Sequence, residues 1–184
     1  MKRYRIPYDQ ETLSSLEILK QGVRSIRIAK DFPHSDFCHS CWLQIDETLH
    51  IQLQATGEDL AFKFEVFPLS ARPVQDSTEG ELHPLVLTTP IEVIPLVTDS
   101  WLDPAVPVGP TVGADPVAQF VGMPGSAPFT ASMVCHYLGG VEIRGSNGNS
   151  LLIATGSFPY SLHVSGFYED PFFNRDSYVA LSTK

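Results

Sequence analysis

Apolar and polar residues alternate over 48–67, and this alternation is the clearest structural signal along the chain. Apolar residues at 49, 51, 53 and 55 alternate with polar ones, and after the turn residues 56–59 the alternation resumes from Leu60 to Val66. A period of two in both arms, with Gly57 in the connection, predicts a β-hairpin with one buried face. We therefore expect an antiparallel sheet with one side in solvent.

The remaining patterns predict one helix and several short strands. Residues 9–20 have Asp9 as a helix-capping residue, leucines at three-residue spacing and Gly22 after the end, which together predict an α-helix. Asn147-Gly148 predicts a hairpin turn within 145–150. We expect strands at 23–29, 42–45, 85–89, 91–94, 131–138, 141–144, 151–154, 160–164 and 178–181.

These elements indicate a mainly β protein, an antiparallel barrel or two-sheet sandwich with one N-terminal α-helix. At 184 residues, the chain is expected to form a single domain, 1–184. Residues 103–128 are dense in Pro and Gly and almost uncharged. We interpret them as a long irregular excursion, an ordered loop lying on the sheet.

Charge is distributed unevenly along the chain. The net charge is −9, but residues 1–30 carry seven Lys/Arg against three acids, a balance of +4, and the remainder carries five against eighteen, a balance of −13. No Lys or Arg occurs between Arg72 and Arg144. An acidic surface repels phosphate backbones, so a basic protein partner is favoured over nucleic acid. The candidate partner-binding residues are Glu92, Asp99, Asp103 and Asp115.

Three cysteines, an odd number, indicate reduced thiols rather than a disulfide framework. Cys38 and Cys41 have the spacing with which two thiolates grip one tetrahedral zinc ion, and a second pair of ligands is needed. Adjacent residues on a strand point to opposite faces, so Cys135 and His136 should not both reach one ion. The alternatives are buried structural cysteines, with no cofactor, and a mixed zinc site drawn from Cys38, Cys41, His34, His39, Cys135 and His136.

Other enzymatic motifs are missing from the sequence. There is no Gly-x-Ser-x-Gly elbow, no Gly-rich phosphate loop and no 12-residue calcium loop. We therefore lean toward a protein that is not an enzyme. The aromatic residues Phe167, Tyr168, Phe172, Phe173 and Tyr178 either plug one end of the core or, if exposed, form a recognition patch.

Three hypotheses on function follow. The first is a non-catalytic, immunity- or inhibitor-like binding protein that presents an acidic face to a basic macromolecular partner. The second is an enzyme or small-ligand binder with its site in the mouth of a β-barrel. The third is a structural or assembly subunit that forms homo-oligomers. No apolar run approaches a membrane span and no signal-peptide core follows Met1, so we expect a cytoplasmic protein without membrane contact.

Overall fold

The computed structural model describes residues 2–30, 38–60, 64–75, 80–102, 133–156 and 160–182. The predicted excursion at 103–128, with Asp103 and Asp115, lies outside the described residues, as does His34. The elements, in chain order, are β1 Lys2–Arg5, α1 Gln10–Ile18, the 3₁₀ turn η1 Leu19–Gln21, β2 Ser25–Lys30, β3 Cys38–Gln44, β4 His50–Ala55, β5 Glu58–Leu60, β6 Phe64–Val66, β7 Leu69–Val74, β8 Glu81–Pro84, β9 Ile91–Leu102, β10 Met133–Gly145, β11 Ser150–Thr155, β12 Leu162–Val164, the 3₁₀ turn η2 Arg175–Ser177 and β13 Tyr178–Ala180.

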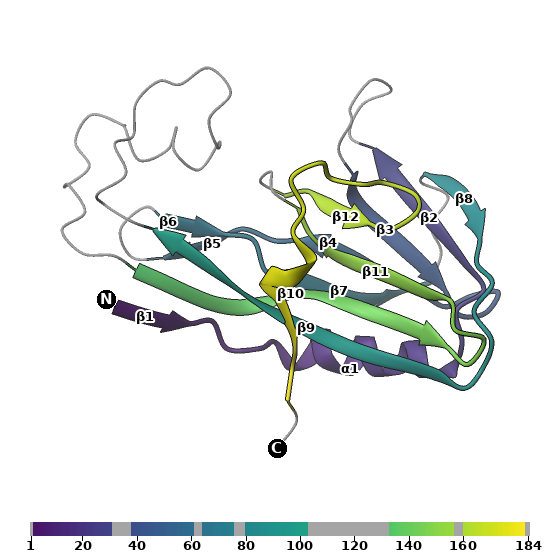
Figure 1. The fold of residues 1–184 in the computed structure, drawn as a ribbon. Helices are drawn as coiled ribbons and strands as arrows, with labels where there is room; N and C mark the ends of the chain where they lie inside the picture. The colour runs from purple at the N-terminus through teal and green to yellow at the C-terminus, as the bar shows by residue number, and fades with distance from the viewer. Residues whose placement is uncertain are drawn as a thin grey trace.

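Eleven of the strands form one curled sheet, a half-barrel (Figure 1). Its main path is β13-β9-β10-β11-β12-β3-β2-β8, and β4 and β7 branch from β3. All pairings are antiparallel except that of β1 with β10. The prediction of a mainly β fold with one N-terminal helix is therefore confirmed.

The sheet has two branches, β8-β2-β3-β4-β7 and β13-β9-β10-β11-β12 (Figure 1). Helix α1 and both branches contribute side chains to the main core. Asp9 caps α1 by accepting hydrogen bonds from the backbone N–H groups of Glu11 and Thr12, as the sequence predicts. Leu16 and Leu19 are fully buried, and α1 packs against β7 while η1 packs against β9. The interior of the half-barrel is filled by apolar side chains from β2, β3, β4, β7, β9, β10, β11 and β12. No described helix is long and apolar enough to cross a membrane.

The hairpin predicted for 48–67 is wrong in its pairing. Strand β4 pairs with β3 on one side and β7 on the other, while β5 and β6 form a separate two-stranded sheet. Both edges of β4 are thus occupied by strands, and the second predicted arm cannot add to either. The predicted faces are nevertheless right: Ile51, Leu53 and Ala55 point into the core.

Four predicted strands also need correction. The described parts of the strands predicted at 131–138 and 141–144, namely 133–138 and 141–144, belong to a single strand, β10, whose register shifts between Leu138 and Gly140. The strand expected at 91–94 continues through Pro95 to Leu102. No strand is found at 85–89; the strand in this region, β8, lies just before it and ends at Pro84. The predicted turn joins β10 to β11, with a positive φ at Gly148 but not at Asn147.

Candidate functional site

The cysteines lie in two separate apolar clusters. Cys38 and Cys41 are fully buried in the main core, and Cys135 packs with Val66 and Tyr137 in a second cluster. Burial, and secondarily the charge of Cys38, raises the pKa of the Cys41 thiol well above its usual value. A raised pKa favours the protonated thiol, which is the weaker nucleophile and metal ligand. Within the described residues, no three His, Cys, Asp or Glu side chains gather closely enough to hold a metal ion.

His136, a metal-ligand candidate, instead bonds to Asp99, a partner-binding candidate. The His136 Nδ1 is hydrogen-bonded to Asp99 Oδ1 at 2.7 Å, and its Nε2 is hydrogen-bonded to the Tyr8 hydroxyl at 3.0 Å. As expected for neighbours on a strand, His136 and Cys135 point to opposite faces. The sequence contains no signal for Tyr8, which precedes α1 and reaches β10 only through the fold. This chain of bonds fixes the entry to α1 against the sheet.

The two described acidic candidates do not share a face. Glu92 and Asp99 are exposed on β9, but they are seven residues apart on one strand and so point to opposite sides of the sheet. Each has a basic neighbour: Arg144 lies 3.9 Å from Glu92, and His136 lies beside Asp99. Their role toward a basic partner stays a prediction.

A pocket forms where the sheet forks. Strand β4 pairs with β3 from Gln44 only as far as Ser40, and two residues earlier Cys38 pairs with Leu162 of β12. The end of β4 leaves β3 at this point and stays with β7, since the Thr56 N–H donates to the Pro68 carbonyl at 2.9 Å.

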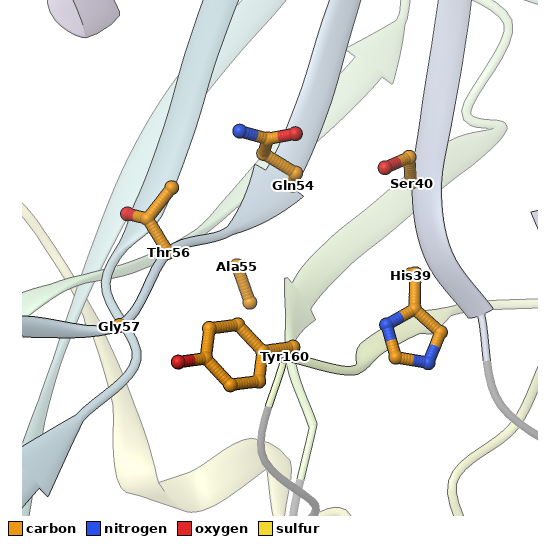
Figure 2. A pocket seen from close by; sticks show the side chains of 7 residues that line it. All are labelled: His39, Ser40, Gln54, Ala55, Thr56, Gly57 and Tyr160. Carbon is orange, nitrogen blue, oxygen red and sulfur yellow. The ribbon is translucent and has the colours of Figure 1, made fainter. Parts of the chain in front are cut away.

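The fork leaves an open pocket of about 370 Å³ between the start of β3 and the end of β4 (Figure 2). Its described lining offers the His39 imidazole, the hydroxyl groups of Ser40, Thr56 and Tyr160, an amide and an aromatic ring, and it includes no carboxylate. Figure 2 shows the Tyr160 ring between the end of β4 and the start of β3. The lining residues are His39, Ser40, Gln54, Ala55, Thr56, Gly57 and Tyr160.

Tyr160 has an unusual backbone conformation at this pocket. Its φ is +58°, and it is the one non-glycine residue with positive φ in the described part of the chain. The residue is 45% exposed, and its ring contacts Phe67 edge-on, with ring centroids 4.8 Å apart. A left-handed conformation costs an aromatic residue about 1–2 kcal/mol, so the surrounding structure holds Tyr160 in place.

The C-terminal aromatic residues divide between the two roles predicted for them. Tyr168 packs against the main core, and Phe173 stacks on His163 at 3.9 Å between ring centroids. Phe167 and Phe172 are exposed, at 38% and 70%. The group therefore covers the sheet with some of its rings and presents others to solvent.

Comparisons with known protein families, with characterised proteins and with solved structures give no match to this chain. The function must therefore be argued from the geometry. Among the residues that line the pocket, the sequence points to His39 alone, as a candidate metal ligand. Gln54 and Tyr160 carry no sequence signal, because the pocket joins three segments that are distant along the chain.

Proposed function

We propose that this chain is a non-catalytic binding protein and that the pocket at the sheet fork anchors a macromolecular partner. The observation that carries the proposal is Tyr160, a partly exposed aromatic residue held at positive φ over a polar pocket. Backbone strain of this kind concentrates at functional sites, where the fold compensates its cost. Partly exposed tyrosines are also characteristic anchors of protein interfaces.

The chemistry of the lining favours binding over catalysis. The pocket offers hydrogen-bonding groups and a ring face, which orient a ligand. The bonded carboxylate–imidazole pair, Asp99 and His136, is not part of this lining. The half-barrel interior is packed with apolar side chains, which argues against a deep ligand site within it.

An NMR titration with short probe peptides tests the proposal. Four acetylated tripeptide amides, Gly-X-Gly with X as Arg, Glu, Gln or Trp, would be titrated separately into isotope-labelled protein. We expect at least one peptide to shift the amide signals of Gln54, Gly57 and Tyr160. Tyr160→Leu should weaken that binding roughly two- to tenfold, and Tyr160→Phe should retain it.

Phe172→Ala is the matched control, since it removes an exposed ring elsewhere on the surface. It should leave the titration unchanged. The proposal fails if no peptide shifts the pocket signals, or if Tyr160→Leu binds as tightly as the wild-type protein.

A basic macromolecular partner, bound by exposed carboxylates such as those on β9, is a second candidate. It is supported by the absence of Lys and Arg from the sequence between Arg72 and Arg144. An oligolysine peptide should bind in 20 mM salt and be lost in 500 mM salt, because charge-steered association is screened. Glu92→Gln and Asp99→Asn, tested singly because the two carboxylates point to opposite sides of the sheet, should lower the affinity on the side that binds. Equal binding at both salt concentrations would contradict this candidate.

A further inference from the structure

On the outer face of β8-β2-β3-β4-β7, opposite to the main core, none of the described strand positions is acidic. Strand registers fix which side chains share this face: where Ile26, Leu43 and Ile51 point inward, their chain neighbours point outward. The fourteen outward positions contain two arginines and no Asp, Glu or Lys, on a chain with a net charge of −9. They are Ser25, Arg27, Ala29, Ser40, Trp42, Gln44, His50, Gln52, Gln54, Ser70, Arg72, Val74, Leu82 and Pro84.

One row of side chains crosses all five strands of this face. The register places Leu82, Arg27, Trp42, Gln52 and Arg72 side by side on successive strands. Among the described elements, only strand neighbours make extensive contacts with β2, β3 and β4. The row is open at the exposed Leu82 and Arg72 and at the half-buried Arg27, whereas Trp42 in its middle is buried.

Neither arginine of the row is neutralised by a described carboxylate. Arg72 Nε donates to Gln52 Oε1 at 2.8 Å, and Arg27 Nη1 donates to the Gly80 carbonyl at 3.5 Å. By contrast, Arg144 and Arg175 on the other branch of the sheet both bond Glu142. Two guanidinium groups held by neutral oxygens keep their full charge and several donors for an incoming anion.

The row adjoins the pocket at the fork. Gln54, in the pocket lining, is the diagonal neighbour of Arg72, and Ser40 is the diagonal neighbour of Arg27. Diagonal neighbours in a sheet are about 7–8 Å apart, within reach of long side chains. The arginines thus flank a pocket that is itself free of described carboxylates.

We infer that this face binds an acidic protein segment in an extended conformation, with carboxylates on Arg27 and Arg72. The inference rests on the proposed function, since it names the partner chemistry of the same site. Single-stranded nucleic acid is the less suitable anion, because it needs ring faces for stacking and Trp42 is only 4% exposed.

Geometry sets the spacing of the carboxylates. Arg27 and Arg72 lie three strand spacings apart, about 14 Å. An extended chain advances about 3.3 Å per residue, so positions i and i+4 lie about 13 Å apart and point to the same side. The structure therefore favours acidic residues at i and i+4.

Isothermal titration and NMR with designed peptides test the inference. The probe is acetyl-Glu-Ser-Ser-Ser-Glu-amide, which has Glu at i and i+4. The controls are the same residues with Glu at i and i+1, and the peptides with Gln or Lys at i and i+4. We expect the i,i+4 Glu peptide to bind at least tenfold more tightly than the Gln or Lys peptide and to lose affinity with salt.

Matched variants locate the binding. Arg27→Gln and Arg72→Gln should each weaken binding of the acidic peptide about tenfold. Arg144→Gln, on the other branch of the sheet, should leave that affinity unchanged. The inference is overturned if the Gln peptide binds equally well, if either row variant has no effect, or if oligothymidine binds in preference. If the NMR signals of the pocket residues shift equally with the Glu, Gln and Lys peptides, the proposed function stands and only this inference is refuted.

Discussion

The strain assigned to Tyr160 can be measured by comparing two substitutions at that position. Alanine at φ +58° meets the same steric penalty as tyrosine, whereas glycine adopts positive φ freely. Tyr160→Ala also loses the edge-on contact with Phe67, worth about 0.5–1.5 kcal/mol. Tyr160→Gly loses the same contact but regains about 1–2 kcal/mol of strain, less about 0.5–1 kcal/mol for the greater freedom of glycine in the unfolded chain.

We therefore expect Tyr160→Gly to be about 1 kcal/mol more stable than Tyr160→Ala and close to the wild-type protein. In a domain of this size that difference corresponds to about 2–4 °C in melting temperature. Urea unfolding followed by circular dichroism would give both free energies of unfolding.

Phe172 provides the control, because it is exposed and does not have a positive φ. Phe172→Gly should be less stable than Phe172→Ala, the opposite order from position 160. If glycine is the less stable substitution at both positions, Tyr160 is not strained and the main support for the binding pocket is lost.

Three further predictions concern the core and the C-terminal segment. His50 Nδ1 is buried without a hydrogen-bond partner among the described residues, so His50→Leu should raise the free energy of unfolding by about 1 kcal/mol in a urea titration; a loss of stability would contradict this. A Cβ at Gly139 would lie 2.6 Å from Thr98 Cγ2 and 2.9 Å from Tyr178 Cε1, so Gly139→Ala should cost about 1–3 kcal/mol by the same assay, and an unchanged midpoint would disprove the close packing. Burial lowers the pKa of His163 below 6.5, so its contribution to stability is present above pH 6.5 and is lost as pH falls through the lowered value; His163→Phe should flatten that dependence, and an unaltered pH profile would refute it.

Local patterns in the sequence were sufficient to predict the helix and most strands. The alternation from Leu49 to Ala55 correctly identifies the residues that face the core, because the side-chain period of a strand is fixed by its backbone. The pairing of β4 could not be predicted in the same way. It depends on β3 and β7 competing for both edges of β4, a long-range outcome that no local pattern contains.

The cysteine pair shows a similar limit. Residues three apart on a regular strand point to opposite faces, yet Cys38 and Cys41 both point into the core. The register between β2 and β3 shifts so that Lys30 pairs with Cys38 while Ala29 pairs with Ser40, which inserts His39 as an extra residue. The bulge changes the face of every residue before it, so the Cys-x-x-Cys spacing becomes a packing feature.

The pocket was beyond prediction from sequence for the same physical reason. It exists because β12 displaces β4 from the edge of β3 at a single residue pair, Leu162 and Cys38. The chain around Tyr160 predicts an ordinary strand, and nothing in it signals a positive φ. Only the assembled sheet brings Tyr160 to His39 and Gln54.

The central claim, that the fork is a binding site, is tested most directly by the NMR signals of its lining during peptide titration. The account predicts that Gln54, Gly57 and Tyr160 shift together and saturate with one affinity, and that Tyr160→Leu weakens that affinity while Phe172→Ala does not. Signals at the fork that stay fixed with every peptide, while the protein remains folded, would contradict it.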